Sequence, residues 1–288
     1  MTPIDITSRV PDGDRTAASD RQHHASDPLT SRRRPACGPR TRNLLGKLAA
    51  AAILVGLWQL TYLLWLPRYA PSPGGVLSHS VGTVSSPEFT SALQSTLLAV
   101  AESLLLGCSL GSLIGLLLGR VAWLRHLSSP YVGGLYAMPM IALVPMMTIW
   151  LGYTTETRLV VVTLSAALPC IVSASDGART APTDLLEVSR VLRMRRRRVL
   201  TDLLLPATLP YVIAGVQVAV GRAVVGAVAV EILANLTGMG TLILADARSF
   251  HQDQAFVAVL SLAIVGLLAR LLISATFRRL APWERPRA

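Results

Sequence analysis

The polar residues inside the long apolar stretches of this sequence include Glu102, Gln217, Arg222 and Glu231. A charged side chain costs roughly 2.5 to 3.5 kcal/mol at the centre of a bilayer, so each must be paired, protonated or in contact with water. They are candidates for a polar translocation pathway, or alternatively for structural pairing between helices. Either Glu102 or Glu231 could neutralise Arg222. Because Glu231 follows Arg222 by nine residues and falls on roughly the opposite arc of a helix, we expect a partner on another helix.

A charged segment, residues 187–206, reads EVSRVLRMRRRRVLTDLLLP and lies between two apolar runs. Its arginines exclude it from lipid and place it in water, by its charge on the cytoplasmic side. Residues 176–210 can form two short helices, the first near 183–192. That helix combines an apolar set with Glu187 and Arg190, which suits docking of a helix into a groove on a partner. The alternative is an amphipathic loop attracted to anionic lipid.

The sequence lacks the motifs of nucleotide hydrolysis and of common enzymes. It contains no G-x-x-x-x-G-K-[ST], since Gly46-Lys47 is followed by Leu, and no H-E-x-x-H or G-x-S-x-G. Its three cysteines form no C-x-x-C pair. We therefore expect no catalytic residues, no metal site and no cofactor, and any energy input must come from a partner.

The elements that carry these residues are apolar and long. Hydrophobic residues make up 52% of the chain and charged residues 15%, and apolar runs of about 20 residues are long enough to cross the hydrocarbon core. The sequence predicts an all-α polytopic membrane protein with about six transmembrane helices and a cytoplasmic coupling loop. The expected spans are approximately residues 49–66, 95–118, 131–151, 159–175, 211–233 and 255–273.

The net charge of +11 is distributed unevenly between alternate connections. Lys and Arg crowd the N-terminal tail, the second-to-third connection, the fourth-to-fifth connection and the C-terminal tail, whereas Arg68, Arg158 and Arg248 stand alone in the other three. This asymmetry predicts a multi-pass protein of the cytoplasmic (inner) membrane with both termini in the cytoplasm. The charge thus reports orientation, and nucleic acid is not an expected partner.

Composition also divides the chain. Residues 1–43 are basic and polar and are expected to form a disordered cytoplasmic tail. Residues 44–284 are expected to form the transmembrane domain, with a cytoplasmic loop at about 176–210, and residues 285–288 the C-terminal tail.

Small residues and prolines mark details of the spans. Glycines at four-residue intervals in the second span predict a smooth face for close helix packing, and they are Gly107, Gly111, Gly115 and Gly119. Pro139 and Pro145 predict a bend in the third span, and Pro169 a bend in the fourth. The prolines and glycines of residues 70–76 predict an irregular connection.

The charged segment resembles the EAA loop of ABC-transporter permeases, and the resemblance extends over about residues 44–283. Glu187 and Ser189 fill the first and third places of the pattern, and Leu205-Pro206 closes it at the usual distance. The closest group is that of nitrate, sulfonate and taurine importers. Arg222 and Glu231 resemble its Gly-Arg and Ala-Glu positions, and residues 238–240 its Gly-x-Gly turn. One departure is Arg193, which stands where the family ordinarily has Gly.

The resemblance implies a set of residues that couple the permease to its ATPase: Leu186, Glu187, Ser189, Arg190, Arg193, Leu205 and Pro206. It also implies a permease subunit that moves a nitrate-, sulfonate- or taurine-like solute by alternating access. The implied partners are two ATP-binding subunits, a second permease copy or paralogue, an extracytoplasmic solute-binding protein and membrane lipid. The alternative is an ion-coupled secondary transporter with Glu102, Arg222 and Glu231 as its charge relay.

Overall fold

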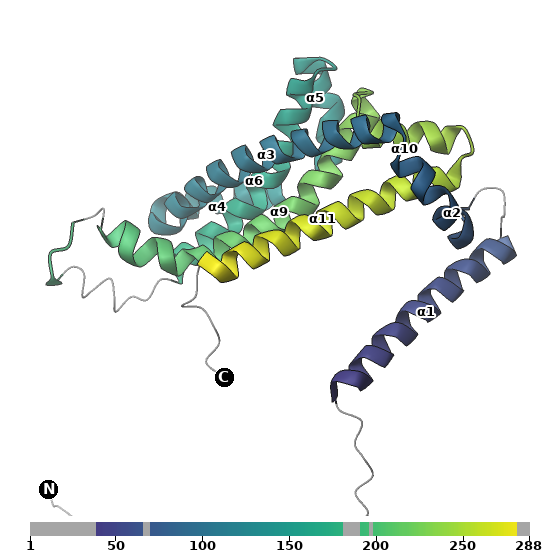
Figure 1. Cartoon of the computed structure of the whole chain (residues 1–288). Helices are drawn as coiled ribbons and strands as arrows, with labels where there is room; N and C mark the ends of the chain where they lie inside the picture. Colours follow the sequence, from purple (N-terminus) through teal and green to yellow (C-terminus); the bar gives the residue numbers. More distant parts are fainter. Residues whose placement is uncertain (1–38, 66–69, 181–190, 196–197, 281–288) are drawn as a thin grey trace, which may run out of the picture. The chain divides into compact units, whose positions relative to one another are not determined.

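The chain folds into helices throughout the part that the computed structural model describes, which is residues 39–65, 70–180, 191–195 and 198–280 (Figure 1). No strand occurs among these residues. The first helix is α1 (Pro39–Trp65), and its described side chains are exposed except for Trp58, Gln59 and Tyr62, which are partly buried. The chain divides within it, because one compact unit ends at Ala51 and a second begins at Ala52. The second unit holds all the other helices.

Two Ser-Pro pairs start the helices that follow. Ser72 and Ser86 accept hydrogen bonds from the backbone N–H of Gly75 (2.9 Å) and Phe89 (3.2 Å), and a proline occupies the first turn of each helix. These helices are α2 (Pro73–Val84) and α3 (Pro87–Arg120). The expectation of an irregular connection over residues 70–76 is therefore wrong from Pro73 onward, since proline is well tolerated at the start of a helix.

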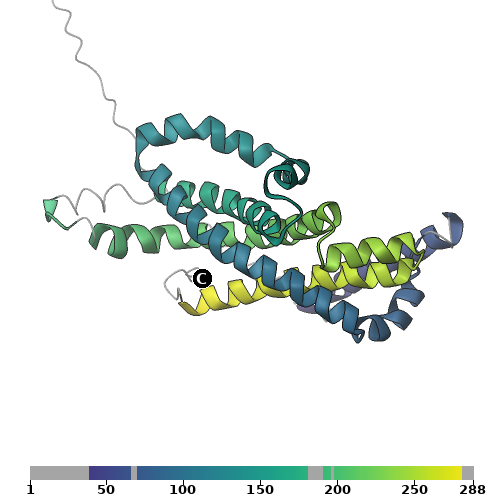
Figure 2. The same cartoon turned by 90° about the horizontal axis from the view of Figure 1, so that it is seen from above.

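The glycine face of α3 packs against α6 (Thr155–Arg179). A Cβ atom on any of the four glycines would lie closer than 3.0 Å to a backbone carbonyl oxygen of α6. The opposing carbonyls also recur every four residues, at Thr163, Ala167, Ile171 and Ser175. The two backbones approach as closely as hydrogen atoms on the glycines allow, and this contact positions α6 between α3 and α9 (Leu205–Ala234) (Figure 2).

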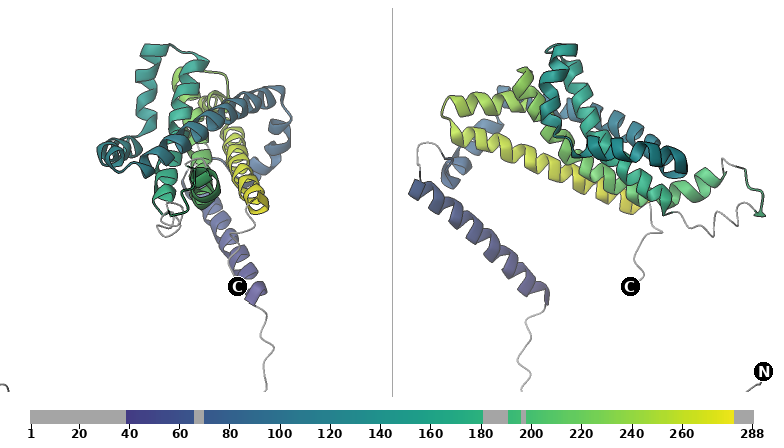
Figure 3. Two further views of the ribbon diagram at one scale, coloured as in Figure 1. Left: turned by 90° about the vertical axis from the view of Figure 1, so that its left-hand side faces the viewer. Right: turned by 180° about the vertical axis from the view of Figure 1, so that it is seen from behind.

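The third apolar stretch is broken. It consists of α4 (Ala122–Ala137), the short 3-10 helix η1 (Met140–Leu143) and α5 (Val144–Leu151), and the two halves meet at 90° (Figure 3). Met138 and Pro139 are extended at the break. A single bent span was expected here, whereas the residue before Pro139 is driven out of the helical region and the helix ends. In α6, Pro169 lies within one uninterrupted helix.

The C-terminal part begins with a π-helix, η2 (Val199–Leu204), which runs directly into α9. Asn235, in the left-handed conformation, ends α9, and α10 (Met239–Arg248) and α11 (Gln252–Leu280) follow and pack together (Figures 1 and 3). Among the described residues, five helices are long and apolar enough to cross a membrane, or six if the broken pair counts as one span. This agrees with the predicted all-α polytopic fold of about six spans.

Candidate translocation pathway and coupling surface

The helices that enter and leave the predicted coupling loop are α6 and the η2–α9 pair. Leu186, Glu187, Ser189 and Arg190 lie outside the described residues. Leu205 and Pro206 form the first turn of α9, directly after η2, where Leu204 is buried and accepts a hydrogen bond from Thr208 Oγ1 (2.9 Å). From this first turn α9 is continuous to Ala234.

Arg193 adopts the left-handed conformation, with φ at 48°, and its side chain is exposed. The turn at this position therefore has the backbone conformation that glycine adopts without penalty and that an ordinary L-residue adopts at a cost of about 1 to 2 kcal/mol. Arg193, which stands where the resemblance to ABC-transporter permeases implies a glycine, thus occupies a left-handed turn.

Arg222 lies midway along α9 and stacks on an aromatic ring. Its guanidinium carbon is 4.2 Å from the centre of the Tyr136 ring, at the end of α4. Both residues line a cavity of about 440 Å³ at the break between α4 and η1, which Ser165 of α6 and Gly226 of α9 also line. Cation–π contact stabilises a guanidinium that is removed from bulk water, and the cation remains available to an anionic group in the cavity.

The expected pairing of Arg222 with Glu102 or Glu231 is wrong. Ion pairs among the described residues join Arg158 to Glu231 and Arg179 to Asp176. Glu102 is exposed on α3. A charge relay through Glu102, Arg222 and Glu231 therefore has no continuous contact in this structure.

Glu231 is fully buried and pairs with Arg158, whose Nη1 lies 3.3 Å from Glu231 Oε1. Thr96 of α3 donates to the same oxygen (2.8 Å), and the backbone N–H of Gly240 donates to Oε2 (2.8 Å). The carboxylate thus receives donors from α3, α6 and the start of α10. Because a buried carboxylate is costly without such partners, these contacts fix the relative position of the three helices.

The turn between α9 and α10 is held by the same cluster. Arg158 Nη1 donates to the Thr237 carbonyl (3.2 Å), and Thr96 Oγ1 accepts from the Met239 N–H (2.8 Å). A Cβ on Gly238 would overlap the Glu231 carboxylate, and one on Gly240 would lie 2.6 Å from the Val228 carbonyl oxygen. The Gly-x-Gly sequence is required because the backbone passes directly against the carboxylate.

Sequence reasoning missed the role of Arg158. It was assigned to a connection, whereas α6 begins at Thr155 and Arg158 is 9% exposed. Its signal was a lone basic residue beside an apolar run. Gln217, also a pathway candidate, lines a different cavity with Arg270, an apolar groove of about 560 Å³ between α9 and α11.

A family model described as "binding-protein-dependent transport system inner membrane component" matches residues 107–286. A Bacillus subtilis protein assigned as an aliphatic sulfonates transport permease is 28% identical over 82% of this chain and 87% of its own length. The taurine transport system permease protein of Escherichia coli is 25% identical over 90% of this chain and 97% of its own. The nitrate import permease protein of Leptolyngbya laminosa is 26% identical over 90% of this chain and 98% of its own length.

Proposed function

The chain belongs to the family of binding-protein-dependent transport system inner membrane components, and from that premise we propose that it moves a small solute with an anionic group by alternating access. It is a multi-pass membrane permease of an ABC importer and not an enzyme. Permeases of this family work with ATP-binding subunits and solute-binding proteins. The observation that carries the proposal is the family match over residues 107–286, which includes the loop, the Arg222 cavity and the Arg158–Glu231 pair.

The proposed assembly contains two ATP-binding subunits, a second permease copy or paralogue and an extracytoplasmic solute-binding protein. The loop between α6 and η2 would contact an ATP-binding subunit in the cytoplasm, with both termini on the same side. The uneven distribution of Lys and Arg supports this orientation.

The mechanism that we propose transmits ATP-driven closure through the two helices that flank the loop. Ser165 lies on α6 and Arg222 on α9, and both line the cavity at the break of α4. Movement of the loop would therefore act on the walls of this cavity directly. The broken α4–η1–α5 segment offers the place where the third wall can reorient, because Met138 and Pro139 interrupt its helical hydrogen bonds.

The solute class follows from Arg222 and the named relatives. A guanidinium presents several N–H donors to the oxygens of an anionic group. The relatives named for sulfonates, taurine and nitrate transport solutes that carry such a group. A sulfonate-, taurine- or nitrate-like solute is therefore the proposed cargo.

The test uses the complete transporter in liposomes with its binding protein and ATP. Glu187→Arg should abolish ATP-driven uptake while the protein remains in the membrane, because the substitution reverses a charge in the proposed docking helix. Glu156→Arg, which makes the same charge reversal in the first turn of α6, is the matched control and should retain most uptake. Normal uptake by Glu187→Arg would contradict the coupling proposal. Uptake that collapses with a protonophore while ATP is maintained would instead favour a secondary carrier.

A further inference from the structure

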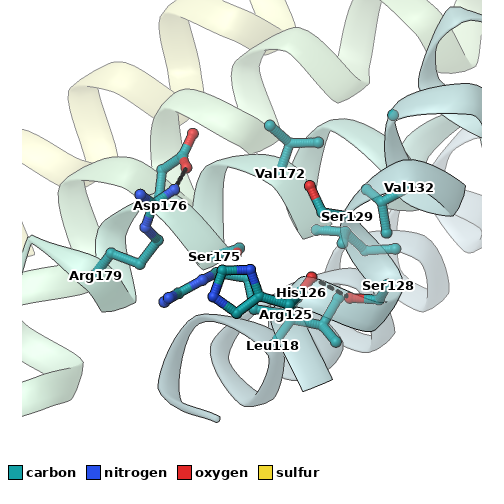
Figure 4. Close-up of a pocket in the computed structure, with 12 residues that line it drawn as sticks. Leu118, Arg125, His126, Ser128, Ser129, Val132, Val172, Ser175, Asp176 and Arg179 are labelled. Atoms are coloured by element: carbon teal, nitrogen blue, oxygen red, sulfur yellow. Dashed lines mark hydrogen bonds and ion pairs between the residues drawn. The ribbon is translucent and has the colours of Figure 1, made fainter. Parts of the chain in front are cut away.

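A second cavity, of about 400 Å³, lies at the ends of α3 and α6 beside the first half of α4 (Figure 4). Its apolar wall includes Leu118, Val132 and Ile171. Its polar side chains come from two elements, with Arg125, His126 and Ser129 on α4 and Ser175 and Arg179 on α6. The volume is in the lower part of the range of small-ligand sites, about 300 to 1,000 Å³.

The charges of this cavity are predominantly positive. Asp176, its carboxylate, is already paired with Arg179 at 3.6 Å. Arg125 is half-buried and forms no ion pair with any described residue. The cavity therefore offers one guanidinium without an anionic partner among these residues, together with serine hydroxyls and an imidazole that can donate hydrogen bonds.

The outer surface of α4 beside this cavity is apolar and aromatic. Trp123, Leu127 and Tyr131 recur every four residues on one side of the helix, with exposures of 69%, 59% and 69%. Such a stripe suits contact with lipid chains, and its aromatic rings suit the headgroup level. A positively charged cavity therefore adjoins a surface that hydrocarbon can cover.

From this juxtaposition we propose that the cavity binds the phosphate of an anionic glycerophospholipid, with the acyl chains lying along the exposed stripe of α4. Arginine and hydroxyl groups are suitable donors to phosphate oxygens. Basic pockets between helices on the cytoplasmic side are suited to anionic headgroups, and the anionic leaflet surface supplies the ligand at high local concentration. The inference rests on the orientation proposed above, which places this end of α3 and α6 at the cytoplasmic surface.

Such a lipid would act beside the coupling loop. Arg179 is in the last turn of α6, and the loop follows Thr180. A phosphate held between Arg125 and Ser175 would join α4 to this end of α6. The bound lipid would thus limit how far these two helices separate during transport.

The experiment measures lipid retention by the purified full-length transporter complex, with phosphatidylglycerol and phosphatidylcholine as probes, by native mass spectrometry. Arg125→Gln should lower the affinity for phosphatidylglycerol about fivefold, the effect of one basic side chain near an anionic headgroup. His126→Gln, at an exposed position, gives a second variant that does not disturb packing. Phosphatidylcholine has the same phosphate but also a choline cation, so its retention should fall less than that of phosphatidylglycerol in both variants.

The matched control is Arg120→Gln, which removes an exposed arginine at the end of the same region but outside the cavity. It should change phosphatidylglycerol affinity less than about twofold, because screened surface charges act weakly. Equal losses in Arg120→Gln and Arg125→Gln would overturn the site. Binding of inorganic phosphate with no preference for phosphatidylglycerol over phosphatidylcholine would also overturn it, since the cavity would then be a site for a free anion only. Neither lipid measurement requires transport. The lipid-site proposal can therefore fail while the proposed transport function holds, and the reverse.

Discussion

Arg158 and Glu231 come from different helices and meet at 3.3 Å in the interior, where Glu231 is fully buried. The pair fastens the first turn of α6 to the last part of α9. Together with Thr96 and Gly240 it also holds α3 and the start of α10. Four helices therefore share one carboxylate, and their relative position at this end of the molecule depends on it.

Replacement of this carboxylate by an amide should destabilise the protein. Glu231→Gln leaves the buried Arg158 without a counter-charge, and breaking one side of a buried pair costs about 3 to 5 kcal/mol. The unfolding midpoint in detergent should fall markedly. Glu102→Gln, which alters an exposed carboxylate on α3, should have little effect. The double variant Arg158→Gln with Glu231→Gln should recover part of the loss, and strictly additive losses would contradict the pairing.

The existence of the spans and the helical class could be predicted from the sequence because apolar runs of membrane length have few alternatives. The ion-pair partner of Glu231 could not be predicted from the sequence. Hydropathy places Arg158 at the edge of a span, but only tertiary packing decides whether a helix begins before or after it. The break at Met138 and Pro139 was likewise underestimated, since a proline predicts a kink without fixing its angle.

A glycine at position 193 should stabilise the turn that Arg193 now forms. With φ at 48°, Arg193 has a left-handed backbone conformation, which is energetically unfavourable for a residue other than glycine. Arg193→Gly should therefore slow hydrogen–deuterium exchange in residues 191–204, with a local gain of up to about 1 kcal/mol. Arg195→Gly changes a neighbouring exposed arginine whose φ is not positive and should speed exchange. Faster exchange in Arg193→Gly would show that the side chain makes a contact that outweighs the strain.

A methyl group on the glycine face of α3 should separate α3 from α6. In Gly111→Ala the new Cβ would lie 2.5 Å from the Ala167 carbonyl oxygen, which belongs to rigid helical backbone. We expect a loss of about 1 to 3 kcal/mol in the free energy of unfolding, from thermal denaturation in detergent. Gly82→Ala, in α2, meets nothing within 4 Å and should be neutral or stabilising. If both changes have the same effect, close packing of α3 on α6 is excluded.

Stability should decrease with rising pH through the titration of Asp246 on α10. Burial raises the pKa of this carboxyl above its ordinary value of 3.8, the charge of Glu88 raises it further, and His251 opposes the shift. Below pH 3.8 both the folded and the unfolded states hold the proton. As pH rises from there to the raised value, the unfolded state loses the proton first, and stability falls.

Asp246→Asn should remove this dependence. The variant should gain stability relative to the wild type as pH increases over that window, measured by thermal unfolding at a series of pH values. Glu88→Gln should move the window to lower pH, because it removes a charge that raises the pKa of Asp246. A constant difference between Asp246→Asn and the wild type at all pH values would contradict the shift.

Transport itself should depend on the guanidinium of Arg222. Arg222→Gln removes the cation from the cavity and should lower the rate of solute uptake about 10- to 100-fold, the contribution of a charge-assisted hydrogen bond of about 1.5 to 3 kcal/mol. Arg222→Lys keeps the charge but loses the planar stacking on Tyr136, so its defect should be smaller. Tyr136→Phe keeps the ring and should transport well, whereas Tyr136→Leu should lose part of the activity.

Arg270→Gln, in the separate groove between α9 and α11, is the control for loss of a cation. Uptake kinetics in liposomes, with KM and maximal rate measured separately and the unfolding midpoint beside them, distinguish a pathway role from a folding role. Equal defects in Arg222→Gln and Arg270→Gln would remove the cavity beside Tyr136 from the pathway, because the loss would then follow net charge and not position.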